Sequence, residues 1–424
     1  MIRIIKSSID DRDAVFSVKE AKVDVSAVVS EIIDKVCREG DAALMYFLEK
    51  FDGVRPESLR VSEAEIDEAF AAVEPELIAV IERAAENIRT FHKEQKSEGF
   101  RIEKKNGVIV GQKVIPVERA GLYVPGGTAA YPSTVLMDAI PAKIAGCERV
   151  VMVTPPMKNG KVNPVILAAA RVAGVDEIYK VGGAQAIAAL AYGTESIPKV
   201  DKIVGPGNAY VAEAKKQVFG TVSIDMIAGP SEILIVADSK NRPKDIAADL
   251  LSQAEHDKMA SAVLVTDDYD FALAVSAELE RQIPELERSE IARVSIDDNG
   301  KIFVTDSIEG AIKIANEIAP EHLELCLDDP FKYLDEIKHA GSVFLGRYCP
   351  EAIGDYFAGT NHTLPTSGTA RFSSPLSVDD FVKKTQYIYY DKESLGEVAR
   401  DVELFAKREG LTAHARSAVI RFED

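Results

Sequence analysis

The sequence contains only six histidines in 424 residues, and four of them lie close to a carboxylate or an amide. The pairings are Gln253 with His256, Glu321 with His322, Asp355 with His362, and Glu409 with His414. Histidine titrates near neutral pH, and zinc takes nitrogen and oxygen ligands. These pairs are therefore candidates for acid–base catalysis or for a metal site. The other two histidines, His92 and His339, lie in charged helical stretches, and we expect both to be solvated.

The segment that ends at His256 has an apolar helical stripe with Gln253 and His256 at its edge. At about 100° per residue, these two side chains stand roughly 60° apart and can reach one ion. A histidine at a helix C-terminus also interacts favourably with the helix dipole, and the segment by itself favours this simpler role. Asp355 and His414 would complete a zinc set, but about 160 positions separate Gln253 from His414. Spacing alone therefore leaves both roles open.

The run Pro320-Glu-His-Leu-Glu-Leu-Cys-Leu predicts a strand that is entered from a loop. Alternation puts Leu323, Leu325 and Leu327 on one face. Glu321 and His322 then stand at the mouth of the strand as an acid–base pair. A strand also rules out the helical metal spacing that His322 and Cys326 would otherwise suggest.

Three glycine turns each follow a predicted strand and precede a predicted helix. They are Gly126-Gly127, Gly182-Gly183 and Gly205-Pro-Gly207. Glycine lets backbone N–H groups approach a phosphate at a helix N-terminus. Neither GxGxxG nor GxxxxGK[ST] occurs, and each turn alone fits ordinary strand-to-helix geometry. Together they indicate a nucleotide crevice at the carboxyl edge of a parallel sheet.

The order of elements predicts the α/β class. The first 100 residues read mainly as helix, and from about residue 108 short β-branched runs alternate with helical runs. This alternation is typical of doubly wound parallel sheets. We expect residues 348–374 to be irregular and the last 50 residues to be helical with a break at Gly410.

Composition restricts the kind of protein further. The chain has 69 acidic against 50 basic residues, a net charge of −19, which argues against a nucleic-acid partner. No apolar run reaches the roughly 18 residues that span a bilayer, and the N-terminus does not have the pattern of a signal peptide. Four separated cysteines indicate a reducing compartment, so we expect a cytoplasmic protein that does not bind membranes. GxSxG, HExxH, kinase and papain-type motifs do not occur, which argues against serine hydrolases and common metalloproteases.

Taken in order, the segments around these residues resemble the histidinol dehydrogenase family. The matching stretches are Gly121-Leu-Tyr-Val-Pro-Gly-Gly-Thr-Ala-Ala-Tyr-Pro-Ser, Val181-Gly-Gly-Ala-Gln-Ala, Gly205-Pro-Gly-Asn-Ala-Tyr-Val, Asp225-Met-Ile-Ala-Gly-Pro-Ser-Glu, Leu251-Ser-Gln-Ala-Glu-His-Asp, Ala319-Pro-Glu-His-Leu-Glu, Gly354-Asp-Tyr-Phe-Ala-Gly-Thr-Asn-His-Thr-Leu-Pro-Thr and Glu409-Gly-Leu-Thr-Ala-His. They run from about residue 115 to residue 414, whereas the first 110 residues carry little of the resemblance.

The resemblance implies a zinc-dependent oxidation of L-histidinol to L-histidine with two NAD, through bound L-histidinaldehyde, as the last step of histidine biosynthesis. It assigns Gln253, His256, Asp355 and His414 to one zinc ion per subunit. It assigns Glu321 and His322 to acid–base catalysis, and Tyr123, Gln185 and Asn208 to NAD. It assigns Ser231, His362 and Glu409 to the substrate, together with His322 and the four zinc ligands.

The resemblance also implies an intertwined homodimer in which Glu409 and His414 act in the partner's site. It implies two incomplete Rossmann-like domains plus small helical terminal segments. The implied boundaries are 1–22 for an N-terminal arm, 23–118 with 235–372 for a discontinuous α/β domain carrying zinc and the catalytic residues, 119–234 for an α/β NAD-binding domain, and 373–424 for a C-terminal dimer-exchange segment.

Three alternative functions remain open from the sequence. The first is a zinc and NAD dehydrogenase of the same fold that oxidises another alcohol, such as a sulfonated diol. The second is a catalytically silent relative that binds a nucleotide or a metal. The third is a zinc hydrolase that turns over without NAD.

Overall fold

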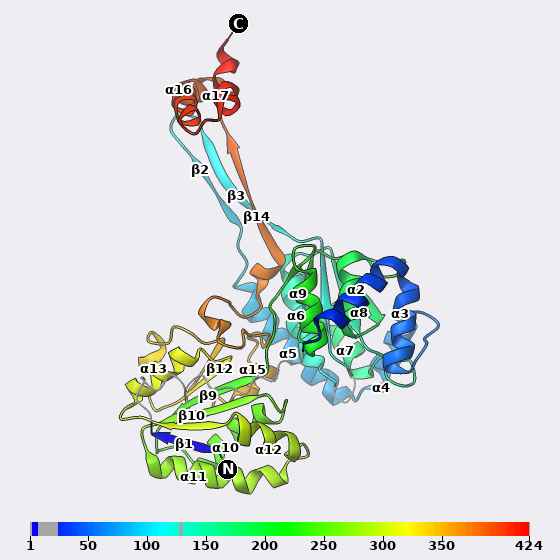
Figure 1. The fold of residues 1–424 in the computed structure, drawn as a ribbon, viewed down its shortest axis with the longest axis vertical. Coiled ribbons are helices and arrows are strands. Elements are labelled where there is room, and N and C mark those ends of the chain that lie inside the picture. Colours follow the sequence, from blue (N-terminus) through cyan, green and yellow to red (C-terminus); the bar gives the residue numbers. More distant parts are fainter. Residues whose placement is uncertain (1, 7–23, 127–129, 424) are drawn as a thin grey trace. The chain divides into compact units, whose positions relative to one another are not determined.

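The computed structural model describes residues 2–6, 24–126 and 130–423. The chain divides into two compact units (Figure 1). Unit 1 contains the residues up to 95 and residues 118–381, and unit 2 contains residues 96–117 and those from 382 onward. Both expected parallel sheets lie in unit 1, so the chain belongs to the α/β class.

The first parallel sheet of unit 1 has six strands among the described residues, in the order β1-β11-β10-β9-β12-β13. Their bounds are β1 Arg3–Lys6, β9 Glu232–Ala237, β10 Ser261–Thr266, β11 Lys301–Val304, β12 His322–Cys326 and β13 Ser342–Leu345. Val, Ile and Leu dominate the central strands because the sheet is covered on both faces.

Helices on the two faces of this sheet close two separate apolar cores. Helices α10 Pro243–Ala254, α11 Tyr269–Gln282 and α12 Ser289–Asp298 bury the face that carries Ile233 and Ile235. Helix α13 Ile308–Ile318 buries the opposite face, against Leu234 and Val236, and the short helix α14 Phe331–Leu334 lies on the same side (Figure 1).

The second parallel sheet has the order β6-β5-β4-β7-β8. Its strands are β4 Arg119–Tyr123, β5 Arg149–Thr154, β6 Glu177–Lys180, β7 Lys202–Val204 and β8 Ser223–Ile224. The connecting helices are α6 Pro132–Ala145, α7 Pro164–Ala173, α8 Gly183–Tyr192 and α9 Ala209–Val218. Numbered along the chain from β4, this sheet has the order 3-2-1-4-5, and the six-stranded sheet has the same order from β9. This is the strand order of doubly wound folds, which bind ligands where the order reverses.

The N-terminal helices pack on the five-stranded sheet. They are α2 Ser26–Glu39, α3 Asp41–Phe47, α4 Glu63–Ala72 and α5 Pro75–Lys93, with the π-helical turn η1 Leu48–Asp52 after α3. Val29, Ile33 and Leu44 belong to the same core as Ile187 and Ile203. The expected boundaries grouped residues 23–118 with 235–372, whereas these helices share their core with the sheet of residues 119–224.

Unit 2 is built on a three-stranded antiparallel sheet. Its strands are β2 Gly99–Glu103, β3 Ile109–Pro116 and β14 Val382–Tyr389, in the order β14-β3-β2. Figure 1 shows these long strands running to the helices α16 Lys392–Arg408 and α17 Thr412–Val419. The helix break expected at Gly410 is present, but β14 was expected to be helix.

Three further expectations were wrong for physical reasons. Residues 348–374 are not wholly irregular, because Pro350 precedes the helix α15 Glu351–Tyr356. The N-terminal strand β1 was missed because it is only four residues long and depends on pairing with β11. His92 is fully buried rather than solvated, and its Nδ1 lies 2.7 Å from Oε1 of Gln95.

Four 3₁₀ turns complete the described elements: η2 Ile283–Glu285, η3 Thr369–Arg371, η4 Val378–Phe381 and η5 Ile420–Phe422.

A buried ion pair holds the turn after β7. The Lys215 ammonium contacts the Asp225 carboxylate and donates to the carbonyl oxygen of Gly205 at 3.0 Å. The Gly205 N–H donates to Asp225 at 2.8 Å. Both side chains of the pair are almost inaccessible, so each charge depends on the other.

Replacement of Lys215 by Met should therefore lower the free energy of unfolding by about 3–5 kcal/mol, because it leaves the Asp225 charge buried without its partner. Urea denaturation at neutral pH measures this loss. The adjacent Lys216 is exposed and pairs only with Glu213, so Lys216→Met is the matched control and should change stability little. Equal stability of the two variants would contradict the structural role of Lys215.

Candidate active site

His322 is the first residue of β12 and lies at the amino edge of the six-stranded sheet. Its Nδ1 lies 3.0 Å from the carbonyl oxygen of Glu232, which can only accept a hydrogen bond. Nδ1 must therefore carry the proton, and the lone pair of the neutral ring is on Nε2. Nε2 is buried and has no hydrogen-bond partner, so it is free to take up a proton or to bind a ligand.

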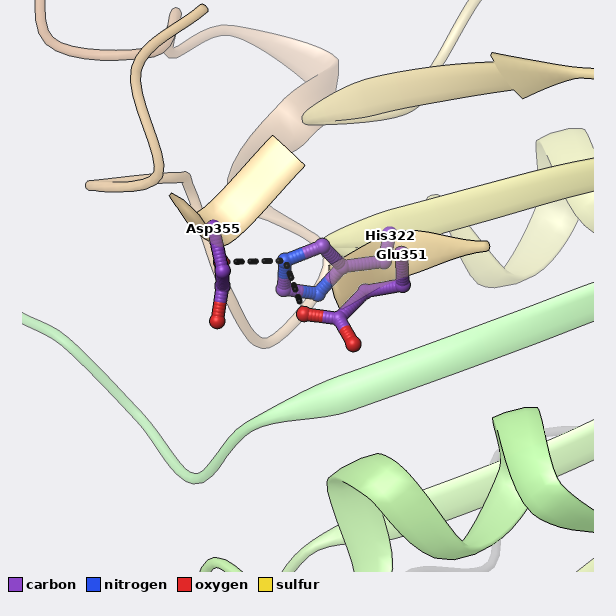
Figure 2. A group of neighbouring side chains, drawn as sticks. All are labelled: His322, Glu351 and Asp355. Carbon is purple, nitrogen blue, oxygen red and sulfur yellow. Dashed lines mark ion pairs between the residues drawn. The ribbon is translucent and has the colours of Figure 1, made fainter. Parts of the chain in front are cut away.

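Two carboxylates face this ring nitrogen. Nε2 of His322 lies 3.7 Å from Oε1 of Glu351 and 4.0 Å from Oδ1 of Asp355, and Figure 2 shows the ring between these two side chains. Potential metal-ligating atoms of the three residues all lie within 4.8 Å of one another. The geometry thus forms a cluster of a kind that could hold a cation.

Glu351 was not among the expected site residues, because the stretch that contains it was expected to be irregular. Glu351 and Asp355 stand four residues apart on α15, so both project from the same face of the helix. Pro350 directly before an acidic residue is a recognisable helix start. That signal, together with the four-residue spacing, could have identified the pair.

Burial of so many carboxyl groups shifts their ionisation. Burial and the neighbouring charge of Asp355 raise the pKa of Glu351 to about 8. Burial also raises the pKa of Glu321 well above its usual range, although the Glu232 N–H donates to its Oε2 at 2.9 Å. Burial lowers the pKa of His322 to about 4, which keeps the ring neutral near pH 7.

Gln253 and His256 lie at the end of α10. Both polar atoms of the buried Gln253 amide are without a hydrogen-bond partner, yet the amide is close enough to Glu351 to influence its ionisation. The exposed His256 interacts electrostatically with Asp355. An orphaned buried amide beside several carboxylates fits the donor set of a zinc ion, because buried polar groups otherwise find partners.

His362 connects this cluster to the five-stranded sheet. Its Nδ1 lies 3.6 Å from Asp355, and its Nε2 lies 3.4 Å from the Thr134 hydroxyl on α6. Burial opposes the positive charge of His362, but Asp355 outweighs this effect and raises its pKa. The following segment is fixed to the same helix, since Thr363 donates to Asp138 at 3.2 Å.

A second group of residues lies at the carboxyl edge of the five-stranded sheet. The Gly183 N–H donates to the Tyr123 hydroxyl at 3.2 Å. Gln185 is buried in the first turn of α8, and Asn208 caps α9 by accepting from the N–H groups of its first turn. The turn between β7 and α9 needs glycine, because a Cβ at Gly205 (φ +116°) would lie 2.1 Å from the carbonyl oxygen of Tyr123.

These residues lie where the topology of the sheet favours a ligand, and their binding of NAD stays a prediction. Tyr123 ends β4 and Asn208 follows β7, and the strand order reverses between these two neighbouring strands. The N-termini of α8 and α9 open beside them and favour an anion. Gly127, which belongs to the first expected glycine turn, lies outside the described residues.

The remaining expected site residues are less closely connected to either group. Ser231 directly precedes β9, at the same edge of the sheet as His322. Glu409 and His414 are exposed and belong to unit 2, at the end of α16 and on α17. Their participation in the site remains a prediction.

The fold and the site together define a doubly wound α/β enzyme of the dehydrogenase type. At one sheet the strand order reverses as in folds that bind nucleotides, and at the other sheet His322, Glu351 and Asp355 form a cluster that could hold a cation. Comparisons with known proteins identify the family within this class. The profile of the histidinol dehydrogenase family matches residues 17–422.

Curated relatives and a solved structure agree with that match. A histidinol dehydrogenase of Bacillus cereus is 57% identical over 94% of this chain and 93% of its own length. One from Clostridium acetobutylicum is 53% identical over 100% of this chain and 99% of its own. The crystal structure of histidinol dehydrogenase from Elizabethkingia anophelis superposes with a TM-score of 0.95 at 40% identity, covering 100% of this chain and 98% of that one. The chain belongs to the histidinol dehydrogenase family.

Proposed function

We propose that this protein oxidises L-histidinol to L-histidine with two NAD, through bound L-histidinaldehyde, in the last step of histidine biosynthesis. Family membership supports the reaction. The single observation that carries the proposal is the neutral, unpartnered Nε2 of His322, which sits inside an acidic cluster at 3.7–4.0 Å from two carboxylates. An alcohol oxidation needs such a base, because the hydroxyl proton must leave as hydride is lost from carbon.

In the first oxidation, Nε2 of His322 accepts the hydroxyl proton of histidinol. The Glu232 carbonyl holds the Nδ1 proton, so it stabilises the imidazolium as the charge forms. The Asp355 carboxylate faces the same ring and stabilises this positive charge as well. The ring does not need to reorient before it can act.

In the second oxidation, Glu321 activates the water that adds to the aldehyde. Its carboxyl group is buried next to His322, with Oε2 at 3.6 Å from Nδ1. The raised pKa makes its ionised form a stronger base than an ordinary glutamate. Hydration of the aldehyde places hydroxyl groups on the carbon that still carries its C–H bond. A second hydride can then leave from this carbon while a hydroxyl proton is removed.

NAD, when bound, accepts hydride in each of the two steps. Tyr123, Gln185 and Asn208 are the residues that would hold it, beside the N-termini of α8 and α9. The pyrophosphate would face the N–H groups at these helix ends. Because the glycine fingerprint is incomplete, we expect fewer backbone contacts to the dinucleotide than in a standard Rossmann domain.

Zinc, when bound, supplies a Lewis acid that helps to orient the amine and imidazole of histidinol. Gln253, His256 and Asp355 would hold it, with His414 from a second copy of the chain. The orphaned amide of Gln253 supports this assignment. Its position near the C-terminus of α10 also favours a cation, because that end of the helix dipole is negative.

We further propose a homodimer in which Glu409 and His414 enter the partner's site. Unit 2 exposes large apolar side chains that a small unit cannot bury by itself, including 70% of Phe405, 71% of Ile388 and 55% of Phe100. Exposed apolar surface of this kind is typical of a protein interface. In the dimer, Glu409 and Ser231 would contact the substrate together with His362.

We place the protein in the cytoplasm, where thiols stay reduced. The described Cys37, Cys147, Cys326 and Cys349 are all free thiols. In the described part of the chain, none of the helices is long and apolar enough to cross a bilayer.

The alternative function is the oxidation of another alcohol, such as a sulfonated diol, by the same machinery. The presence of Glu409 and His414 favours histidinol, because these residues would recognise its cationic groups. A comparison of kcat/KM for the two alcohols distinguishes these functions.

Incubation of the purified protein with histidinol and NAD should yield about two NADH per histidine. Chelation of zinc should abolish the reaction, and added zinc should restore it. Absorbance at the NADH band and quantification of histidine measure the ratio. The proposal fails if zinc-loaded protein forms no NADH from histidinol.

Substitutions at the acid–base pair should separate the two oxidations. His322→Asn should lower kcat for histidinol by about 10²–10⁴-fold, the usual contribution of a general base. Glu321→Gln should harm the oxidation of supplied histidinaldehyde more than the first step. Glu309→Gln, at an exposed position in the first turn of α13, is the control and should retain activity. Equal turnover of histidinaldehyde by Glu321→Gln and the parent protein would refute the role of Glu321.

Metal analysis distinguishes the proposed ligands from the adjacent carboxylate. Gln253→Ala and Asp355→Asn should weaken zinc binding by at least about tenfold, because each removes a proposed ligand, whereas Glu351→Gln should keep most of the affinity. Competition with a zinc-binding dye measures the affinity without any enzyme assay, and Gln282→Ala at the end of α11 is the control. If Glu351→Gln lost zinc while Gln253→Ala kept it, the ion would instead belong to the cluster of His322, Glu351 and Asp355.

A further inference from the structure

Unit 1 contains a cavity of about 680 Å³ that none of the roles above uses. It lies near the carboxyl ends of β5 and β6, with Lys180, the last residue of β6, in its wall. Its described lining residues come from the segment after η1, the start of α4, the turn after β5 and the end of β6. The charged residues among them are Arg55, Glu57, Arg60, Glu65, Lys158, Lys161 and Lys180.

The charge of this cavity is opposite to that of the whole chain. Five of its described lining residues are basic and two are acidic, although the chain carries a net charge of −19. A second cavity of about 340 Å³ has one basic residue, Lys199, and one acidic residue, Asp201. Of these two cavities, only the larger one therefore has an excess of positive charge.

Backbone hydrogen bonds fix the walls that carry these charges. The Lys180 N–H donates to the Leu59 carbonyl at 2.7 Å, and the Val61 N–H donates to the Ile178 carbonyl at 2.9 Å. This pairing attaches the segment that carries Arg60 to the edge of β6. Across the cavity, two bonds of 2.8 Å between Met157 and residues 160–161 close the turn that carries Lys158. The cationic groups therefore stand on an ordered backbone.

Several of the basic groups remain available to a ligand. Arg60 and Lys158 are exposed and form no ion pair with any described residue. Among the described residues, Lys161 pairs with Glu68, and Arg55 pairs with Glu49. Both partners are exposed, and exposed ion pairs are weak enough for a ligand to displace. Lys180 differs, because it is buried and bonded to Glu65 at 2.6 Å, which keeps that carboxylate neutralised.

We propose that this cavity binds a small polyanion that carries phosphate groups, at a site separate from the proposed dinucleotide residues. Arg60 supplies a planar pair of donors and Lys158 a point charge, the two side chains most often used for phosphate. The volume fits a molecule between pyrophosphate and a phosphorylated sugar in size. Tyr123, Gln185 and Asn208 are absent from the lining, so this cavity does not include the residues proposed for the dinucleotide. Gly53 in the wall follows Asp52, whose charge acts on Tyr123, so the two sites adjoin.

Isothermal titration of the full chain with sodium pyrophosphate, at low and constant ionic strength, tests this site. Parallel titrations use inorganic phosphate, citrate and ribose 5-phosphate. Arg60→Gln and Lys158→Gln should each weaken pyrophosphate binding by about tenfold, because each removes a charge-assisted hydrogen bond. Lys199→Gln, in the smaller cavity, removes an exposed lysine of the same type and should leave the affinity unchanged. All these side chains are exposed, so the variants should fold, and circular dichroism verifies this.

Saturable binding of pyrophosphate that is weakened by both cavity variants and unaffected by Lys199→Gln supports the site. The titration is repeated with saturating NADH, and unchanged binding supports the separation of the two sites. Loss of pyrophosphate binding in the presence of NADH would put the anion in the dinucleotide crevice and overturn the proposal. Equal affinity of all variants, tighter binding of citrate than of every phosphate, or no saturable binding would also overturn it. None of these results depends on whether histidinol is the substrate.

Discussion

Several buried carboxyl groups surround one imidazole, and this crowding is the constraint on which the site depends. Glu321, Glu351 and Asp355 all lie within 4.0 Å of a His322 ring nitrogen. Like charges this close cannot all be ionised without a cation, and the raised pKa values of Glu321 and Glu351 express that repulsion together with burial. A zinc ion or a cationic substrate would relieve it. The site therefore favours the binding of positive charge before any chemistry begins.

The two parallel sheets use opposite edges for their proposed roles. The residues of the nucleotide crevice lie at the carboxyl edge of one sheet, where helices begin and backbone N–H groups face outward. The acid–base residues lie at the amino edge of the other sheet, where α10 ends near Gln253. Helix N-termini favour anions and C-termini favour cations. The same repeated strand order thus suits a dinucleotide in one sheet and a metal with a cationic substrate in the other. His362 joins the two, since it contacts Asp355 on one side and Thr134 of α6 on the other.

Charge is distributed unevenly in this protein, with one region of concentrated negative charge and one of concentrated positive charge. The acidic cluster around His322 concentrates negative charge where cations are expected, while the cavity that contains Arg60 and Lys158 concentrates positive charge near the carboxyl ends of β5 and β6 in the other sheet. Most of the remaining acidic residues are exposed, and they contribute to the general field and to solubility. Net charge therefore argues against a nucleic-acid partner, but it did not indicate where a ligand of either sign would bind.

The sequence by itself determined the alternation of elements. Apolar runs such as those of β5, β9 and β10 are short and β-branched, glycine turns follow β4, β6 and β7, and the helices between the strands have a clear period. These signals are local, so they survive without tertiary information. The pairing of Glu321 with His322 is local too, because the two residues are adjacent in the chain, and the resemblance supplied the remaining site residues.

Only the tertiary structure decided which edge of which sheet carries each group, that helices α2–α5 cover the five-stranded sheet, and that Glu351 joins His322. It also decided the tautomer of His322 through the carbonyl of Glu232, which lies 90 positions away in the chain. The strands β1 and β14 depended on it too, because a strand is stabilised by partners that are distant in sequence, and no local pattern records which partner it will find.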